Sequence, residues 1–453
     1  MTKIHPDEVQ RFILDSAVEA NILPITSRCD SHCLFCSHKN NPPDITAISI
    51  GVRSVEEITR TLAFLDPDRV IAIGESATPV IEGEPFSHPA FREIIALARR
   101  VFPHTPMEVT TNGRFLTRDM VEFLEAAGNI SLNVSLNSAS AHGRKLLMGD
   151  TPEQSGRTIA GVELLSVSSV RFSGSLVAMP NVTGWEDIRD TVAFLARNRA
   201  AAVRVIVPAF SSWARPELVP DEHRLRCQLG EFVRALSAET PCPVLIEPSR
   251  VSDLRAVVSG VVKDSPAWNA GIRRDDVLLT INGRSPRCRV EAWQWLLPKG
   301  EVHAEVERAE RAGSVVWTNR IEGDAGITME YDFDPVRAED IRRSVMACPG
   351  RSVLLTSELG HTVIGEVLEL MDIGRDKAES IKVINRTFGG IIGAAGLLTV
   401  DDYLESYIAW RDRGQEPSQM IVPLESFDCC GFDLRRRHFS DLQRRTGVPV
   451  ILK

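Results

Sequence analysis

The stretch PITSRCDSHCLFCSHK, residues 24–39, carries three of the nine cysteines of this 453-residue chain. The thiols of Cys29, Cys33 and Cys36 are separated by three residues and then by two, with Phe35 just before the last one. This spacing lets one tight loop present three thiolates to three corners of a cubane iron–sulfur cluster. The fourth iron then has no protein ligand, so the pattern predicts a cluster with one open position.

A zinc site is the alternative use of these thiols, with His32 or His38 as the fourth ligand. Structural zinc sites usually pair Cys-x-x-Cys knuckles, or Cys/His pairs that lie far apart in the sequence. No second knuckle follows in this chain. The spacing therefore favours the iron–sulfur cluster, with zinc as the competing interpretation.

The first two hundred residues alternate β-rich runs with amphipathic helical patterns. One predicted helix begins after Ser54, which Glu57 follows at capping-box spacing. Repeated strand–helix units require a parallel sheet, because each crossover returns the chain in the same direction. We expect an α/β fold, a partial (β/α)6 barrel over residues 1–247, with its functional loops at the carboxyl ends of the strands. The predicted strands are Asn21–Ser27, Arg69–Gly74, Met107–Thr111, Ser131–Ser135, Ser173–Ala178 and Val203–Val207.

The pattern Cys-x-x-x-Cys-x-aromatic-Cys, placed after the first predicted strand, resembles the signature of the radical S-adenosylmethionine (SAM) enzymes. In that family the thiolates, here Cys29, Cys33 and Cys36, hold a 4Fe-4S cluster, and SAM binds its open iron. The resemblance implies reductive cleavage of SAM to a 5′-deoxyadenosyl radical, which abstracts a hydrogen atom from a substrate. It also implies an electron donor such as flavodoxin or ferredoxin. The substrate, a small molecule or a peptide, stays open.

Residues at the later strand ends resemble the SAM-binding segments of the same family. Gly74-Glu75 stands where the family's Gly-Gly-Glu segment meets the amino group of SAM, and Gly83-Glu84 is similar to a Gly-Glu-Pro version. A strand-end glycine lets a ligand approach the backbone, and a glutamate accepts charge-assisted hydrogen bonds from an ammonium. Which glutamate contacts SAM stays open. The other cofactor-binding residues that the resemblance implies are Phe35, Thr111, Asn112, Ser135, Asn137 and Met179.

The texture of the sequence changes near residue 250, where short β runs with turn signals replace the long helices. SPAWNAGI (265–272) followed by DDVLLTING (275–283) resembles the PDZ module, and we place a PDZ-like domain at 248–330. A carboxylate-binding loop like Gly-Leu-Gly-Phe is not evident, since Ser-Asp-Leu-Arg (252–255) stands near that place. Peptide capture by strand addition is therefore open, and a docking or spacer domain is the alternative.

We expect a mixed α/β domain over residues 331–453, with strands at Arg351–Thr356 and Ile381–Asn385 and a helix at Asp401–Arg411. The segment NRTFGGIIGAAGLLTVDDYLESY (385–407) resembles the C-terminal domain of the uncharacterised bacterial PDZ-containing radical-SAM FeS oxidoreductases. In those relatives the PDZ module precedes the radical core, whereas here it follows the core. An auxiliary cluster could use Cys348 with Cys429 or Cys430, but no second spaced triad appears, and buried free thiols are the simpler interpretation.

Composition sets further limits. With 43% apolar and 25% charged residues, the chain has the make-up of a soluble globular protein. Its net charge of −9 argues against a broad nucleic-acid or anionic-lipid surface, so we expect neither nucleic acid nor membrane as a partner. The N-terminus lacks a secretory signal, and no apolar run is long enough to cross a bilayer. We therefore expect a cytoplasmic protein with reduced thiols.

Two functions from different classes fit the sequence. The first is a radical-SAM oxidoreductase or transferase with an unidentified substrate. The second is a non-catalytic scaffold that uses the cysteines for zinc or an iron–sulfur cluster and recruits partners through the PDZ-like domain.

Overall fold

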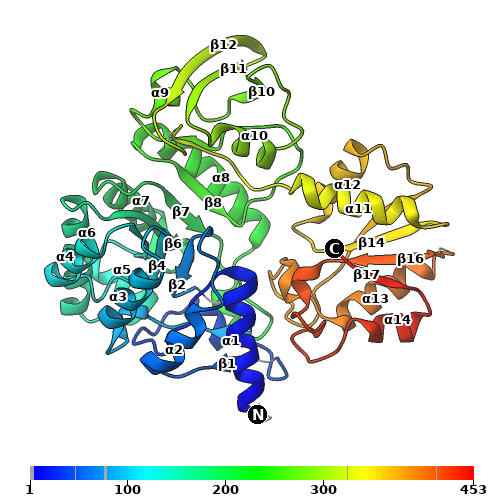
Figure 1. Cartoon of the computed structure of the whole chain (residues 1–453), viewed down its shortest axis with the longest axis horizontal. Coiled ribbons are helices and arrows are strands. Elements are labelled where there is room, and N and C mark those ends of the chain that lie inside the picture. Colours follow the sequence, from blue (N-terminus) through cyan, green and yellow to red (C-terminus); the bar gives the residue numbers. More distant parts are fainter. Residues whose placement is uncertain (1–4, 46, 76–78, 324, 415) are drawn as a thin grey trace. The chain divides into compact units, whose positions relative to one another are not determined.

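The computed structural model of the chain describes residues 5–45, 47–75, 79–323, 325–414 and 416–453, and Figure 1 shows it coloured along the sequence. By its internal contacts the chain divides into two compact units. The first comprises the described residues of Met1–Asn41, Ile45–Phe210 and Ala214–Glu247, and the second those of Pro42–Asp44, Ser211–Trp213 and Pro248–Lys453. None of the helices in the described ranges has both the length and the apolar character that crossing a bilayer requires.

The first unit is organised around a six-stranded sheet in which every neighbouring pair of strands is parallel. The strand order follows the chain, β2-β4-β5-β6-β7-β8, as successive right-handed strand–helix crossovers produce. The α/β fold predicted for this part of the chain is confirmed. The strands are β2 (Ile71–Ile73), β4 (Met107–Thr111), β5 (Ile130–Ser135), β6 (Arg171–Val177), β7 (Val203–Ile206) and β8 (Val244–Glu247).

Helices follow the strands and cover the sheet with their apolar sides, and Figure 1 shows α3, α4 and α6 outside the strands. The buried side chains of strands and helices form one continuous core, with Ile73, Val109 and Val134 from the strands and Ile95 and Leu124 from the helices. The helices are α1 (Pro6–Ala20), α2 (Val55–Leu62), α3 (Phe91–Val101), α4 (Arg118–Ala127), α5 (Ala141–Met148), α6 (Pro152–Ser166), α7 (Pro180–Arg197) and α8 (Glu222–Glu239). The short strands β1 (Ile48–Ser49) and β3 (Val80–Ile81) pair separately.

The segment predicted as the first strand, Asn21–Ser27, is not a regular strand. It runs beside β2, where Leu23 N donates to Ala72 O at 2.8 Å, but it forms only isolated bridges. Pro24 has no N–H to continue the ladder, which explains the interruption. The last strand of the sheet is β8 (Val244–Glu247), which the prediction did not include.

The second unit begins with a small β-rich region around its own apolar core. Its main sheet is antiparallel, in the order β10-β11-β12, and β9 and β13 form a separate pair. A short helix opens at Ser265, whose hydroxyl accepts a hydrogen bond from Trp268 N. The elements are β9 (Gly260–Val261), α9 (Pro266–Asn269), β10 (Val277–Ile281), α10 (Arg289–Leu296), β11 (Gly300–Arg308), β12 (Arg311–Asn319) and β13 (Ile327–Thr328).

The rest of the second unit is a four-stranded parallel sheet with helices on both faces, which confirms the predicted α/β class. The strand predicted at Ile381–Asn385 is shifted, because the pairing with β14 covers Ala378–Lys382. The elements are α11 (Pro335–Ala347), β14 (Ser352–Thr356), α12 (His361–Leu370), β15 (Ala378–Lys382), α13 (Val400–Arg411), β16 (Gln419–Val422), α14 (Ser440–Thr446) and β17 (Val450–Leu452). Short 3-10 helices lie at Ser37–Lys39, Pro85–Ser87, Pro216–Leu218, Ala395–Leu397 and Leu424–Ser426.

The capping box at the start of α2 is expected to stabilise that helix locally. The Ser54 hydroxyl accepts a hydrogen bond from Glu57 N, and the Glu57 carboxylate accepts one from Ser54 N. Loss of an N-cap costs about 1 kcal/mol. We expect Ser54→Ala to speed amide hydrogen exchange in α2 about fivefold, because local opening becomes easier by that free energy. Thr59→Ala, on the same helix but outside the cap, is the control, and equal acceleration in both variants would contradict the prediction.

Candidate functional site

The loop that carries the three cysteines is fastened to the C-terminal end of α5. His32 N donates to Met148 O at 3.0 Å, and Leu34 N donates to Leu147 O at 2.8 Å. These bonds use carbonyls that a helix leaves unpaired at its last turn. Gly149, with φ at 71°, ends the helix, and a Cβ there would meet His32 Cβ at 3.3 Å. The left-handed backbone and the close approach of loop and helix therefore both favour glycine at this position.

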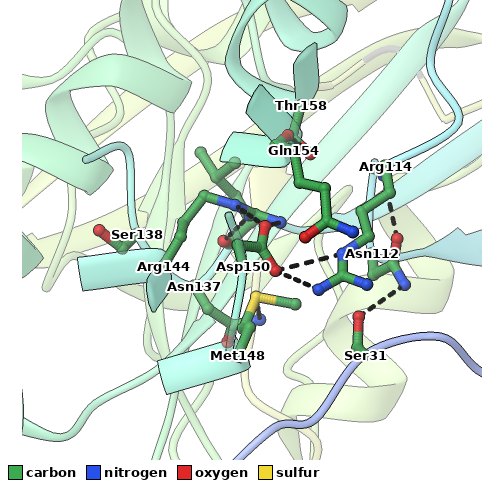
Figure 2. Close-up of polar contacts among 12 residues, drawn as sticks. Ser31, Asn112, Arg114, Asn137, Ser138, Arg144, Met148, Asp150, Gln154 and Thr158 are labelled. Atoms are coloured by element: carbon green, nitrogen blue, oxygen red, sulfur yellow. Dashed lines mark hydrogen bonds and ion pairs between the residues drawn. The ribbon is translucent and has the colours of Figure 1, made fainter. Parts of the chain in front are cut away.

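A buried charge network lies under the same loop (Figure 2). The fully buried carboxylate of Asp150 pairs with Arg114 through one oxygen and with Arg144 Nη2, at 2.8 Å, through the other. Arg114 Nη1 also donates to the backbone oxygen of Asp30 at 2.6 Å and lies 3.1 Å from its carboxylate. Arg144 Nη1 donates to Leu136 O at 2.5 Å, at the end of β5. The network thus connects the cysteine loop with the segments that follow β4 and β5, with α5 and with the turn between α5 and α6.

The three thiols are close enough to influence one another electrostatically. Burial, followed by the proximity of Cys29 and Cys36, raises the pKa of Cys33 to about 12, while Lys39 and Arg114 oppose the rise. Burial also raises the pKa of Cys29. Three thiolates together would repel one another unless a cation lay between them. The iron ions of a cluster supply that positive charge, so the donor set fits such a group.

The thiols do not converge on a single point. Within the described ranges, no three or more His, Cys, Asp or Glu side chains are arranged to hold one metal ion. The three cysteines with His32 or His38 do not form such a group, and neither does Cys348 with Cys429 or Cys430. In a cubane each thiolate binds a different iron, so its ligands do not meet at one atom. The exposed thiols of Cys429 and Cys430 lie 3.7 Å apart, while Cys348 is buried.

The Gly83-Glu84 segment lies against the cysteine loop. A Cβ on Gly83 would come within 2.1 Å of Arg28 O, so only glycine permits this contact. The Glu84 carboxylate is buried and accepts hydrogen bonds from the Thr111 hydroxyl and from Asn112 N, each at 2.7 Å. Burial raises the pKa of Glu84 to about 7, against these two hydrogen bonds, which lower it. No cationic side chain pairs with Glu84 among the residues that the structure describes.

Gly74-Glu75 lies at the end of β2 in a different environment. Gly74 has φ at 81°, and a Cβ there would meet Thr110 O at 2.5 Å. Glu75 is half-buried and accepts a hydrogen bond from the Thr110 hydroxyl at 3.1 Å. The neighbouring Ser76 lies outside the described residues. Gly74 therefore allows a sharp turn at the strand end, and Glu75 keeps more of its carboxylate accessible than Glu84 does.

The predicted site residues on β4 meet the cysteine loop directly. Asn112 Nδ2 donates to the Ser31 hydroxyl at 3.0 Å, and the Asn112 side-chain oxygen accepts a hydrogen bond from Arg114 N (Figure 2). Thr111 is buried and holds Glu84. Phe35, within the loop, is half-buried. The structure therefore brings Phe35, Thr111 and Asn112 into one region with the cysteines.

The predicted residues on β5 and β6 take part in internal contacts. Ser135 Oγ lies 3.2 Å from the Ser175 hydroxyl. Asn137, at φ 62°, donates through Nδ2 to Ser135 O at 3.0 Å and accepts from Val177 N at 3.0 Å. The polar atoms of Asn137 thus hold two strand ends together. Met179 is buried at the start of α7.

The sequence prediction missed the arginine–aspartate network. Arg144 lies on a helix where charged residues are usually solvated, yet it is fully buried here. The partners Arg114 and Asp150 are 36 residues apart in the sequence, so no local motif marks them. The sequence contains one indirect indication of the network. Arg114 directly follows the Thr-Asn-Gly segment at the end of a predicted strand, where functional loops are expected.

Comparison with known families matches residues 23–195 to the radical SAM superfamily. This range begins before the cysteine loop and continues through most of the parallel sheet. A second match assigns residues 257–306 to the PDZ domain. One segment of the chain thus matches the radical SAM superfamily and a later segment matches the PDZ domain, in the order that the sequence motifs predicted. Members of this superfamily bind a 4Fe-4S cluster and SAM.

Individual relatives match only part of the chain. It is 26% identical over 202 residues to the AdoMet-dependent heme synthase of Methanosarcina barkeri, covering 44% of this chain and 54% of that protein. It is 36% identical over 120 residues to the GTP 3′,8-cyclase of Klebsiella pneumoniae, covering 26% and 34%. Among solved structures, SuiB of Streptococcus suis bound to SAM aligns with a TM-score of 0.38 and 17% identity, over 54% of this chain and 57% of that one. The chain therefore spans about a third to a half of the curated relatives.

The buried network predicts a large difference between two aspartates. We expect Asp150→Asn to destabilise the protein by about 3 kcal/mol, because it leaves the buried guanidinium of Arg144 without a counter-charge and that of Arg114 with Asp30 alone. In thermal unfolding this should lower the midpoint of the transition by about 6 °C or more. Asp119→Asn is the matched control, since it removes an exposed partner of Arg92 and should cost under about 1 kcal/mol. Similar midpoints for the two variants would contradict a structural role for the network.

Proposed function

We propose that the chain is an enzyme whose Cys29, Cys33 and Cys36 hold a 4Fe-4S cluster, with SAM at the open iron. The observation that carries the proposal is the triad of thiols on one loop, which hydrogen bonds hold to the end of α5 and to Asn112 and Arg114 after β4. When bound, the cluster supplies an electron to the sulfonium of SAM, and the resulting 5′-deoxyadenosyl radical abstracts a hydrogen atom from a substrate. A reduced flavodoxin or ferredoxin is the electron source that we propose.

The residues around the thiols favour a bound cluster in two ways. Lys39 and Arg114 place positive charge near Cys33, which stabilises its thiolate form. The Asp150 network and the bonds to α5 hold the loop in place before any cofactor arrives. Pre-organisation lowers the entropic cost of ordering the loop upon binding.

Glu84 is the better candidate for the amino group of SAM. A buried carboxylate is normally paired with a cation, and Glu84 accepts only uncharged donors among the described residues. Its negative charge acts on Cys29, so it lies near the cluster loop. An ammonium group from SAM would supply the missing counter-charge. Glu75, which is more accessible to water, needs no such partner.

The other predicted residues have supporting roles in this proposal. Phe35 offers apolar surface for adenine, whereas Met179, expected from the sequence to flank adenine, is buried and has almost no exposed surface to offer. Thr111 and Asn112 hold Glu84 and the cysteine loop in place through their hydrogen bonds. Ser135 and Asn137 shape the edge of the site through the contacts at their strand ends. Gly74 allows the backbone at Thr110 on β4 to lie close to the end of β2.

The domain limits that we propose are residues 1–247 for the radical SAM core, 248–330 for the PDZ-like domain and 331–453 for the C-terminal α/β domain. We propose that the PDZ-like domain recruits a peptide or protein partner, as PDZ domains do by adding a strand to a sheet edge. Hydrogen abstraction from a peptide or from a small molecule is compatible with this arrangement.

Cluster binding is tested on Cys33. After anaerobic reconstitution with iron and sulfide, we expect the unaltered protein to be brown, to hold about four irons per chain and to release 5′-deoxyadenosine from SAM under reduction. Cys33→Ala should lose the 4Fe-4S spectrum and the product, because one corner of the cube has no ligand. Cys227→Ala, an exposed thiol on α8, is the control and should keep both. A colourless protein that holds one zinc ion would overturn the proposal, and so would a brown, active Cys33→Ala variant.

The affinity for SAM distinguishes the roles that we propose for Glu84 and Glu75. We expect Glu84→Gln to weaken SAM binding to the reconstituted protein about tenfold, which corresponds to roughly 1.4 kcal/mol. Glu75→Gln should change the Kd by less than about threefold. Equilibrium dialysis with radiolabelled SAM measures both, at equal iron content so that cluster loss does not contribute. A larger effect in Glu75→Gln would assign the amino group to Glu75.

A further inference from the structure

Two adjacent cysteines occupy a tight turn that follows β16 and the 3-10 helix Leu424–Ser426. Cys429 and Cys430 are the central residues of this β-turn, which Gly431 N closes by donating to Asp428 O at 2.7 Å. Their Sγ atoms lie 3.7 Å apart, and both residues are exposed. In an extended strand, successive side chains point to opposite faces, so adjacent thiols stay apart. The turn instead places the two thiols next to each other, where a reagent in solution reaches both.

The carboxylate of Asp428 holds the backbone of this turn. Its Oδ1 accepts hydrogen bonds from Cys430 N at 3.0 Å and from Phe432 N at 2.9 Å. Its Oδ2 pairs with Arg436 Nη1 at 3.0 Å. The backbone N–H of Asp428 also donates to Phe432 O at 2.8 Å, on the far side of the cysteines. The thiols are therefore close together before any bond joins them, and such placement gives their reaction with each other a large effective concentration.

The spacing of adjacent residues decides what kind of disulfide this pair can form. Consecutive Cα atoms are about 3.8 Å apart across a trans peptide bond. Most disulfides join residues whose Cα atoms are about 4.4–6.8 Å apart, so a bond between adjacent cysteines is strained. Strained and exposed disulfides are readily reduced, in contrast to the disulfides that stabilise folds. The geometry therefore favours a pair that is oxidised and reduced reversibly.

We propose that Cys429 and Cys430 form a covalent modification site, which small disulfides of the glutathione type oxidise to a disulfide within the turn. One thiolate attacks the small disulfide, forms a mixed disulfide with it and releases one thiol. The neighbouring thiolate then attacks the protein sulfur of the mixed disulfide and releases the second thiol. Two protein thiols thus lose two electrons and two protons, and the oxidant gains them as two thiols. The site uses neither the cluster nor SAM.

Peptide mass after oxidation tests this proposal on the full chain. The protein is incubated anaerobically with excess glutathione disulfide, treated with iodoacetamide and digested with trypsin. The tryptic peptide of residues 414–435 contains Cys429 and Cys430 and no other cysteine. We expect this peptide to lose two hydrogen atoms, to carry no glutathione and to resist alkylation. Dithiothreitol added before iodoacetamide should restore alkylation of both thiols, because the strained bond is readily reduced.

Two single thiols serve as controls in the same experiment. Cys227 is exposed on α8, and its Sγ lies 3.9 Å from His223 Nδ1 with no cysteine adjacent in the sequence. It should keep the glutathione that it acquires, because no neighbouring thiol displaces it. Cys429→Ser should make Cys430 keep glutathione in the same way. Serine is close to cysteine in size, and position 429 is exposed, so this variant should fold normally.

Several results would overturn the proposal. One is glutathione that stays on the peptide of residues 414–435 in the unaltered chain, and another is a pair of thiols that stays open to alkylation. A disulfide from Cys429 or Cys430 to a different cysteine or to a second chain would also contradict it, as would a Cys430 free of glutathione in Cys429→Ser. These readouts are peptide masses, so they do not depend on how much cluster the protein holds.

Discussion

The carboxylate of Asp150, buried between the guanidinium groups of Arg114 and Arg144, is the interaction on which the cysteine loop depends. Removing two cations and one anion from water is costly, and only the short paired contacts offset that cost. With Nε and Nη2 directed at Asp150, Arg114 directs Nη1 toward Asp30 in the loop. The loop is therefore held by a charge that the sheet and helices have already fixed in place.

Glu84 holds the same region from another direction. Its carboxylate ties the segment after β3 to the end of β4, while the backbone of Gly83 packs on Arg28 just before the first cysteine. One buried carboxylate is balanced within the protein and the other accepts only neutral donors. This asymmetry separates a structural charge, Asp150, from one that a cationic ligand group would complete.

Local signals predicted much of the fold, and long-range contacts account for what they missed. The limits of the strand Met107–Thr111 and the cap at Ser54 agree with the structure, because alternation and capping act over a few residues. Pro24 interrupts the segment predicted as the first strand. The strand β8, which ends at the proposed domain limit of residue 247, was not predicted. The cysteine pattern is contiguous and could be identified, whereas the Asp150 network joins residues that no local pattern relates.

The chain uses the carboxyl ends of parallel strands twice, with opposite chemistry. Asn112 follows β4 at the carboxyl edge of the first sheet and contacts the loop of thiols through Ser31, while Glu84 reaches this edge from the segment after β3. In the second sheet the corresponding cavity is lined mainly by apolar side chains, among them Leu354 and Ile421. The topology creates a site at both places because neighbouring strand ends open there. The side chains at those ends set the chemistry of each place, polar and charged beside the first sheet and mainly apolar in the second.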